Sequence, residues 1–295
     1  MGLIRSRYTM SYRLNGSLIL HNTFSGAQWV VPAELQDEVL AVLKSGLDGQ
    51  MTSASRWLRM LGFVVPGGTD EVANAREAHR AKMEDQGIQQ LILMPTEQCN
   101  FRCVYCYEAF LRPKMPLEVR EGLKLFVKKK APQLRELHVS WFGGEPLIAR
   151  DVIKELSLSF LETCDEHGIA YRAGMTTNGY LLLPPVAEEL VLKLKVTDYQ
   201  ITVDGPCEEH DRKRKLISGH GTFDRIFSNL KAMKQLQGEF RVGIRVNFDQ
   251  QNHSKIPGFI EKLVEEFSGD PRFHVLFRPI ERWGGPNDST LPVFS

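Results

Sequence analysis

Three cysteines lie close together in the segment TEQCNFRCVYCYEA, residues 96–109. Cys99, Cys103 and Cys106 have the spacing Cys-x3-Cys-x2-Cys, and thiolates spaced in this way can hold a zinc ion or an iron–sulfur cluster. A structural zinc site normally takes four protein ligands, and no His or Cys lies within thirty residues after Cys106. Three thiolates on a cubane cluster leave one iron available for a substrate or cofactor. The spacing therefore favours an iron–sulfur cluster, and zinc or unrelated buried thiols stay open as alternatives.

Four other short motifs contain residue types that bind charged groups. They are WFGGEP at 141–146, TTNG at 176–179, TVDGP at 202–206 and the Asn of RVNFD at 245–249. Glycines such as Gly143 and Gly144 let a backbone approach a ligand without interference from a Cβ atom, and the carboxylate of Glu145 can bind an ammonium group.

Apolar runs alternate with amphipathic helical stretches from Leu91 onward. The runs are LILMPT, LHVSWFGG, YRAGMTTNG, DYQITVDG, RVGIRVNFD and FHVLFRPI. This alternation predicts an α/β fold with successive βα units and a parallel sheet, in the form of an open or partial barrel. Ligands of such sheets bind at the carboxyl ends of the strands, because loops and helix N-termini converge there. The cysteines, GGEP, TNG, DGP and Asn247 each follow or end one of the first five runs, so motif positions and topology agree.

The first ninety residues have a different pattern. Strand-like runs YTMSYRL, LILHNTF and QWVVP are separated by turn signals, of which Asn15-Gly16 is typical of a hairpin. Helical spacing follows in residues 33–46 and 53–62, and residues 69–87 form a polar helical stretch with little apolar face. We therefore expect a small α+β module at 1–68, a solvated helical linker at 69–90, the barrel at 91–283 and the start of a C-terminal extension at 284–295.

The composition excludes several classes of function. Lys+Arg (37) and Asp+Glu (36) nearly balance, so the bulk charge indicates neither a nucleic acid nor an anionic membrane as a partner. No signal peptide is recognisable, and no apolar run approaches the roughly 18 residues that a membrane span requires. Cys164 and Cys207 complete an odd count of five cysteines, which is not typical of a secreted disulfide framework. We expect a soluble, cytoplasmic protein in which Cys164 is structural.

The cysteine motif, followed by WFGGEP one βα unit later, resembles the signatures of the radical S-adenosylmethionine (SAM) superfamily. The resemblance runs from Leu91 to about Ile280. It implies a partial (β/α)6 TIM-like barrel, bound SAM, and a [4Fe–4S] cluster held by Cys99, Cys103 and Cys106. It further implies roles for residues around SAM. Tyr105 is expected to face the adenine of SAM, Asn178 to lie near its ribose, and Asn247 to lie in the same pocket. Gly143, Gly144 and Glu145 are expected to contact the amino group of SAM, and Thr202 and Arg214 to bind its carboxylate group.

No catalytic residue follows from the sequence. Asp204 and Cys207 lie at a strand end near the inferred site and are candidates for contact with the substrate, although Asp204 is equally suited to forming a turn. Arg245 and Arg278 are further candidates for pocket roles, and His210 is expected to hold a turn.

The segment TVDGPCEEHDRKR resembles a stretch typical of the peptide-modifying branch of the superfamily, whose members usually carry a cysteine-rich C-terminal SPASM domain. No cysteine follows Cys207, so we expect that domain to be absent or truncated. The order of elements in the N-terminal module resembles the winged-helix-like peptide-recognition element of ribosomal peptide maturases, which can bind a leader peptide as an added strand.

The resemblance implies an enzyme that reductively cleaves SAM to a 5′-deoxyadenosyl radical and forms a cross-link in a precursor peptide or protein. An electron donor such as flavodoxin or ferredoxin is the second implied partner. The nearest alternative is an anaerobic sulfatase-type maturase that oxidises a single side chain. An alternative of another class is a non-catalytic adaptor that binds zinc or a cluster and uses the N-terminal module to bind a partner.

Overall fold

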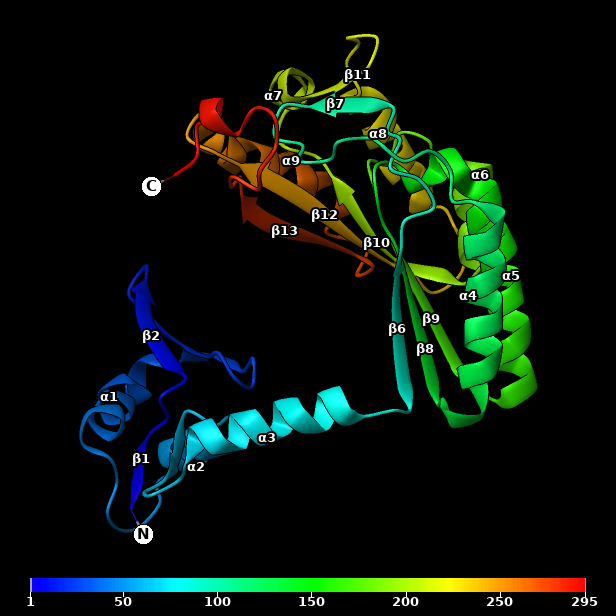
Figure 1. The fold of residues 1–295 in the computed structure, drawn as a ribbon. Helices are drawn as coiled ribbons and strands as arrows, with labels where there is room; N and C mark the ends of the chain where they lie inside the picture. Colours follow the sequence, from blue (N-terminus) through cyan, green and yellow to red (C-terminus); the bar gives the residue numbers. More distant parts are fainter. Residues whose placement is uncertain (1, 295) are drawn as a thin grey trace. The chain divides into compact units, whose positions relative to one another are not determined.

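The computed structural model describes residues 2–294, which form two compact units, Met1–Asp85 and Gln86–Ser295 (Figure 1). The first unit contains a three-stranded antiparallel sheet of β2 (Thr9–Leu14), β3 (Ser17–Asn22) and β4 (Gln28–Val31), in that order. Asn15 and Gly16 join β2 to β3 with φ angles of 49° and 81°, as expected for the turn type that Asn-Gly favours. A second pair, β1 (Leu3–Arg5) with β5 (Val64–Pro66), was not indicated by the sequence.

Two helices pack against the sheets of the first unit. The 3-10 turn η1 (Ala33–Leu35) leads into α1 (Gln36–Ser45), which ends at Gly46 with φ 74°. The helix α2 (Ser53–Met60) begins at Thr52, whose hydroxyl accepts a hydrogen bond from the backbone N–H of Ser55. The core of the unit includes the fully buried side chains of Leu18, Leu20, Val39, Leu58 and Phe63.

The helix α3 (Glu71–Glu84) has no buried residue, as its polar sequence predicts. It begins at Asp70, whose carboxylate accepts a hydrogen bond from the backbone N–H of Ala73 at 2.9 Å. This helix belongs to the first compact unit, and the second unit begins with Gln86.

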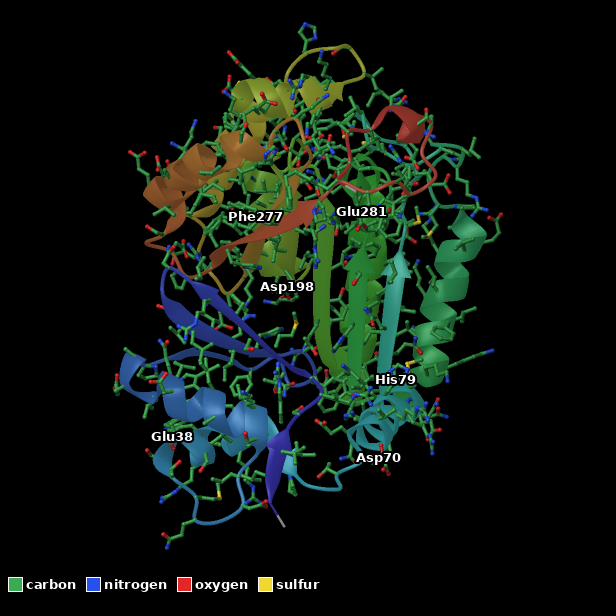
Figure 2. The ribbon with its side chains drawn as sticks, turned by 90° about the vertical axis from the view of Figure 1, so that its left-hand side faces the viewer. Glu38, Asp70, His79, Asp198, Phe277 and Glu281 are labelled. Atoms are coloured by element: carbon green, nitrogen blue, oxygen red, sulfur yellow. The ribbon has the colours of Figure 1, made fainter. Side chains whose placement is uncertain are left out.

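The second unit contains a parallel sheet of six strands, which confirms the predicted α/β class. In spatial order they are β6 (Ile88–Leu93), β8 (Glu136–Trp141), β9 (Ala170–Thr177), β10 (Val196–Thr202), β12 (Arg241–Phe248) and β13 (Phe273–Pro279). The strands follow chain order across the sheet, and β6 and β13 form its two edges. Phe277 on β13 is 43% exposed (Figure 2). The sheet is therefore an open barrel.

The crossover helices lie on one face of this sheet (Figure 1). They are α4 (Leu117–Lys130), α5 (Arg150–His167), α6 (Pro184–Glu188) with the π-helical turn η4 (Glu189–Lys193), α8 (Phe223–Met233) and α9 (Ile256–Phe267). Short 3-10 turns occur at Ala131–Gln133, Pro146–Ala149, His253–Lys255 and Asp288–Thr290. Right-handed crossovers between strands in sequential order place all helices on the same side.

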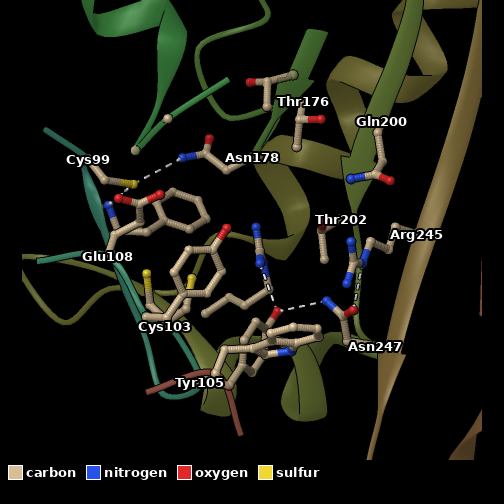
Figure 3. A pocket seen from close by; sticks show the side chains of 18 of the residues that line it. Cys99, Cys103, Tyr105, Glu108, Thr176, Asn178, Gln200, Thr202, Arg245 and Asn247 are labelled. Carbon is tan, nitrogen blue, oxygen red and sulfur yellow. Dashed lines mark hydrogen bonds between the residues drawn. The ribbon is translucent and has the colours of Figure 1, made fainter. Parts of the chain in front are cut away.

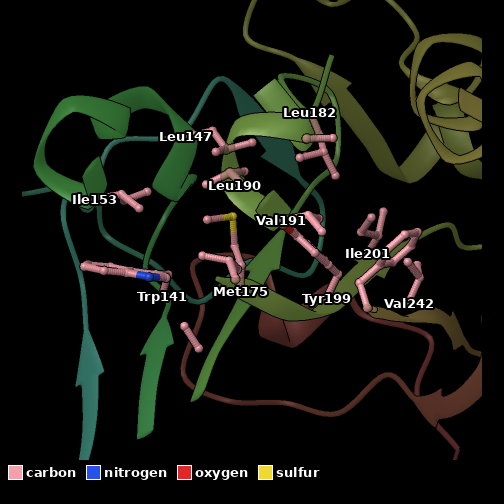
Figure 4. Packing of buried hydrophobic residues seen from close by; sticks show 14 of the residues in the cluster. Trp141, Leu147, Ile153, Met175, Leu182, Leu190, Val191, Tyr199, Ile201 and Val242 are labelled. Carbon is pink, nitrogen blue, oxygen red and sulfur yellow. The ribbon is translucent and has the colours of Figure 1, made fainter. Parts of the chain in front are cut away.

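Side chains alternate between the two faces of each strand, which separates the core from the concave face. Trp141, Met175, Ile201 and Val242 belong to the buried core (Figure 4). Gln200, next to Ile201 in β10, points to the concave face instead and lines a pocket there. No helix among residues 2–294 combines the length and apolar character that a membrane span needs.

The buried core should set the stability of the second unit. Phe160 on α5 has no exposed surface, and the substitution Phe160→Ala should lower the free energy of unfolding by about 3–5 kcal/mol through lost contacts and a cavity. Phe126 on α4 is 38% exposed and provides the matched control, because Phe126→Ala removes the same atoms from a partly hydrated position. Denaturant titration measures both, and equal losses would contradict the assignment of the core.

Candidate functional site

An open pocket lies at the carboxyl ends of the strands, where the cysteine loop meets β9, β10 and β12 (Figure 3). The structure brings most of the predicted cluster and SAM residues into its lining, namely Cys99, Cys103, Cys106, Tyr105, Gly143, Gly144, Asn178, Thr202, Arg214 and Asn247. Arg245 lines the pocket as well. The side chains of Glu145, Asp204, Cys207 and Arg278 are outside the lining.

A short antiparallel ribbon holds the cysteine loop beside Arg214. The strand β7 (Phe101–Cys103) pairs with β11 (Arg214–Leu216), and Cys103 lies directly opposite Arg214. The backbone N–H of Val104 extends the pairing to the carbonyl group of Lys213 at 3.0 Å. Strands of three residues are too short to show a period of two in the sequence, so this pairing was not predicted.

The Gly143–Gly144 turn packs against the other side of the cysteine loop. The backbone N–H of Glu145 donates to the carbonyl group of Gln98 at 2.9 Å. A Cβ atom on Gly144 would lie 2.2 Å from the carbonyl oxygen of Glu97, and Gly143 has a φ of 113°. The two glycines are therefore required for close backbone packing, in addition to their place in the pocket lining.

Glu145 is fully buried, and its carboxylate accepts hydrogen bonds from the protein itself. The donors are Thr177 Oγ1 and the backbone N–H of Asn178, each at 2.7 Å, and the backbone N–H of Leu147 at 3.0 Å. Burial raises the pKa of the Glu145 carboxyl group. These contacts tie the glycine turn to the end of β9, and direct contact of the carboxylate with a ligand stays a prediction.

The hydroxyl group of Tyr105 joins three parts of the site (Figure 3). Arg214 Nη1 and Asn247 Nδ2 donate to Tyr105 Oη at 2.8 and 3.1 Å, and Tyr105 Oη donates to the carboxylate of Asp204. Asp204 is fully buried, and its other oxygen accepts a hydrogen bond from the backbone N–H of Asn247 at 3.0 Å. Burial raises the pKa of Asp204, while the positive charge of Arg214 opposes the shift. Asp204 thus holds Tyr105 in place from behind the pocket.

His210 supports the same region from the helix α7 (Cys207–Lys213). Its buried ring accepts a hydrogen bond from the backbone N–H of Asp204 at Nδ1, 3.2 Å away, so Nε2 carries the proton and donates to Thr222 Oγ1 at 3.0 Å. Thr222 Oγ1 in turn donates to the carbonyl group of Arg214 at 2.7 Å. Burial lowers the pKa of His210 well below its ordinary value, which keeps the ring neutral. This arrangement agrees with the turn-holding role expected from the sequence.

Cys207 lies at the start of α7, outside the pocket. Its thiol donates to Asp211 Oδ2 at 3.6 Å, and the other carboxylate oxygen of Asp211 accepts from the backbone N–H of Thr222 at 2.7 Å. Next to this helix, Lys213 and Asp249 form a buried ion pair with an N–O distance of 2.5 Å. Both features connect α7 to its neighbours and not to the pocket.

Asn178 reaches the cysteine loop from the end of β9. Its Nδ2 atom donates to Asn100 Oδ1 at 2.8 Å and lies 3.9 Å from Cys99 Sγ (Figure 3). On β12, Arg245 Nε donates to Asn247 Oδ1 at 2.7 Å, and Arg245 lies directly opposite Thr202 in the sheet.

Several lining residues were missed by the sequence interpretation. Thr176 and Gln200 line the pocket from β9 and β10, together with Phe142, Tyr107, Glu108, Phe110, Glu281 and Trp283 from the surrounding loops. The alternation Thr176-x-Asn178 and Gln200-x-Thr202 was a usable signal, because side chains two residues apart on a strand share a face.

The thiol groups fit a metal cluster. Burial raises the pKa of Cys103 to about 12 and that of Cys99 to about 11, so these groups become thiolates only where a cationic centre compensates the charge. Within residues 2–294 no three His, Cys, Asp or Glu side chains converge on one point where they could share a single ion. A cubane cluster has no such requirement, because each thiolate binds a different iron.

The cation beside them fits a carboxylate ligand. Arg214 lines the pocket, is 7% exposed, and its Nε atom is buried without a hydrogen-bond partner in the described part of the chain. Buried donors in native structures are normally paired, so the guanidinium group keeps unused donor capacity beside the cysteines. The residues present are therefore compatible with both the cluster and SAM.

The glycine turn can be tested by one substitution. Gly144→Ala should lower the free energy of unfolding by about 1–3 kcal/mol and reduce iron uptake, because the new Cβ atom clashes with the backbone of the cysteine loop. Gly122→Ala on α4, where nothing lies within 4 Å of the new atom, should leave iron uptake unchanged. Iron analysis after anaerobic reconstitution would contradict the packing argument if both variants bound iron like the wild type.

Buried, neutral His210 should make stability depend on pH. Below pH about 6.5 the unfolded chain takes up a proton at His210 and the folded protein does not, so the free energy of unfolding should fall as the pH is lowered. Between pH 7 and 5.5 the free energy of unfolding of the wild type should change more steeply with pH than that of His210→Gln, by up to about 1.4 kcal/mol per pH unit. His220→Gln, at an exposed position, should retain the wild-type slope. Equal slopes for all three proteins would contradict the prediction.

Comparison with known proteins agrees with this geometry. Curated relatives include the cysteine-type anaerobic sulfatase-maturating enzyme of Clostridium novyi, 26% identical over 187 residues that cover 60% of this chain and 49% of the relative. Another is the radical SAM cyclopropyl synthase TigE of Paramaledivibacter caminithermalis, 23% identical over 194 residues that cover 59% of this chain and 39% of the relative. The chain thus spans less than half the length of these relatives.

A similar fold occurs in the solved structure of a histidine-tagged form of anSMEcpe with bound AdoMet. The TM-score is 0.56 at 22% identity, over 65% of this chain and 51% of that one. The sequence also matches the Radical SAM superfamily over residues 93–263, more than half of the chain. This protein therefore belongs to the radical SAM superfamily, whose members bind a [4Fe–4S] cluster and S-adenosylmethionine.

Proposed function

We propose that this protein is a radical SAM enzyme that modifies a peptide or protein, forming a cross-link in a ribosomally made precursor. The observation that carries the proposal is the pocket itself, in which three cysteines, Tyr105 and Arg214 meet at the carboxyl ends of the strands. Support for a peptide or protein substrate comes from the relative named as a sulfatase-maturating enzyme.

In this proposal Cys99, Cys103 and Cys106 hold the cluster. When bound, the cluster and SAM supply reductive cleavage of the sulfonium group to a 5′-deoxyadenosyl radical. Arg214 and Thr202 bind the carboxylate group of SAM, and the backbone of Gly143 and Gly144 faces its amino group. Asn178 and Asn247 provide amide groups for the ribose and adenine side of the ligand, next to Tyr105.

Hydrogen bonds with Tyr105 hold the side chains of Arg214 and Asn247 in place before any ligand binds. Arg214 has its position fixed by Tyr105 and by the backbone of β11, so binding a carboxylate costs little side-chain ordering. Thr176, Gln200 and Arg245 line the pocket from the sheet and are available to contact a substrate. Holding reactants at close range in one orientation is the main contribution that a protein makes to such chemistry.

The N-terminal unit is proposed to bind a segment of the substrate. Its three-stranded sheet has β2 and β4 as edge strands, and an edge strand offers unpaired backbone groups to an added peptide strand. We further propose a cytoplasmic location, where free thiols persist and a flavodoxin or ferredoxin can supply electrons.

Oxidation of a single side chain in a target protein is the second candidate, and the sulfatase-maturating relative favours it. A non-catalytic adaptor that holds zinc or a cluster is the candidate of another class. The two enzyme candidates share SAM cleavage, and the adaptor lacks it.

Replacement of the three clustered cysteines tests the proposal. Anaerobically reconstituted wild-type protein should be brown and should release 5′-deoxyadenosine from SAM with dithionite. Ala at positions 99, 103 and 106 together should abolish iron uptake and nucleoside release, because the thiolates are the iron ligands. Cys164→Ser, a change to the buried cysteine of α5, should retain both properties. A colourless wild-type protein that binds zinc and releases no 5′-deoxyadenosine would support the adaptor instead.

A further inference from the structure

Arg245 is a pocket residue to which the proposed function gives no definite ligand. It lies on β12, and its Nε atom donates to Asn247 Oδ1 at 2.7 Å. This hydrogen bond fixes the side chain, whereas its two Nη atoms form no hydrogen bond and no ion pair within residues 2–294. The pocket therefore contains a second guanidinium group with unused donors in a planar fork, besides that of Arg214.

The two arginines lie on different sides of the pocket. Arg214 lies directly opposite Cys103 in the ribbon of β7 and β11, so it is beside the cluster ligands. Arg245 comes from the sheet and lies across the pocket from Cys99, next to Thr202 (Figure 3). Because the proposed function assigns the carboxylate group of SAM to Arg214, the fork of Arg245 is left for an anionic group of the substrate.

A second unpaired arginine extends the positive charge along the concave face. Arg278 on β13 lies opposite Asn247, and Leu276 lies opposite Arg245. Residues two apart on a strand share a face, so Arg278 is a diagonal neighbour of Arg245 on the concave side. Arg278 is exposed, and in the described part of the chain it forms no hydrogen bond and no ion pair. Two neighbouring strands thus bring two uncompensated cations to the carboxyl end of the sheet.

The acidic groups nearby do not neutralise these cations. Glu108 and Glu281 line the pocket from loops, and neither forms an ion pair with Arg245. Glu108 lies on the opposite side of the pocket from Arg245 (Figure 3). Arg272, just before β13, shows the contrasting case, because it forms an ion pair with Asp270 at 2.6 Å. Cations held at a pocket wall without a counter-ion attract anions to that wall.

We propose that Arg245, supported by Arg278, binds a carboxylate group of the peptide substrate close to the residue that reacts. The proposal rests on the proposed function and adds the substrate class, namely a peptide that brings an acidic side chain or its C-terminus to the pocket. Two Nη–H donors match the two oxygens of a carboxylate, whereas a neutral amide offers one acceptor oxygen. Thr176 and Gln200, which line the pocket from β9 and β10, offer neutral polar groups to the adjoining peptide backbone.

Short Gly-Ser peptides with an uncharged fluorescent label at the N-terminus test the proposal. The first contains one Glu and has an amidated C-terminus, the second has Gln in place of Glu, and the third has Gln and a free C-terminal carboxylate. Fluorescence anisotropy measures their binding to the reconstituted holoprotein with SAM, without a reductant. The first or the third peptide should bind about tenfold more tightly than the second at low ionic strength, and added salt should reduce the difference. A preference for the first peptide assigns the carboxylate to a side chain, and a preference for the third assigns it to a chain end.

Substitutions at the arginines locate the preference. Arg245→Gln should abolish it, and Arg278→Gln should reduce it about threefold. Arg245→Lys keeps the charge without the fork and should retain part of the preference. Arg241→Gln is the matched control, because it removes the same charge from the exposed amino end of β12 on the same face, and it should bind the peptides as the wild type does.

A comparison between peptides separates recognition of the carboxylate from a general disturbance of the site. Loss of the hydrogen bond from Arg245 to Asn247 affects all three peptides alike, whereas loss of the carboxylate contact affects only the charged ones. The proposal is wrong if the wild type binds all three peptides equally, or if Arg245→Gln keeps the preference that Arg241→Gln shows. Failure of the wild type to release 5′-deoxyadenosine with dithionite would instead contradict the proposed function, and peptide binding is measured independently of that reaction.

Discussion

The buried hydroxyl group of Tyr105 is the contact on which the layout of the site depends. It accepts hydrogen bonds from Arg214 and Asn247 and donates to Asp204, so one oxygen atom links the cysteine loop, β11 and the ends of β10 and β12. Tyr105 and Asn247 are far in the sequence from each other and from the segment that contains Asp204 and Arg214. Because Asp204 has no exposed surface, loss of the Tyr105 hydroxyl group would leave one of its buried carboxylate oxygens unpaired, which costs more than the hydrogen bond itself contributes. The loop that holds the three thiols therefore has one strongly preferred position.

The cysteine loop is also fixed along its backbone, from two sides. The glycine turn after β8 approaches it so closely that a Cβ atom at Gly144 has no space, and β11 pairs with it on the other side. Two elements that are far apart in the chain thus fix the position of one short loop. In radical SAM proteins the cluster is exposed to a cofactor at one iron, so the loop that carries it has to be rigid without being covered. Backbone hydrogen bonds at the two sides of the loop meet this requirement and leave its pocket side free.

The sequence predicted the large elements well because each carried a physical signal of sufficient length. The six parallel strands were found from apolar runs that helices separate, and the Asn15-Gly16 turn from its dipeptide. The ribbon of β7 and β11 and the pair of β1 and β5 were not found, since three residues show no periodicity. Site residues were predicted from the family resemblance, together with their position at strand ends, and such a position gives proximity but not direction. Glu145 and Asp204 lie close to the pocket and point into the protein, and only the contacts of Thr177, Asn178 and Tyr105 decide that orientation.

The open edges of the barrel determine what kind of molecule can reach the pocket. A closed barrel admits a ligand only along its axis, so a long chain would have to enter by one end. Here β6 and β13 are not neighbours in the sheet, and Ile92 and Phe277 on these strands are 66% and 43% exposed. A polymer can lie across the concave face sideways, with an internal residue at the pocket and both of its arms extending outward. The open sheet thus allows either a chain end or an internal residue of a polymer to lie at the pocket.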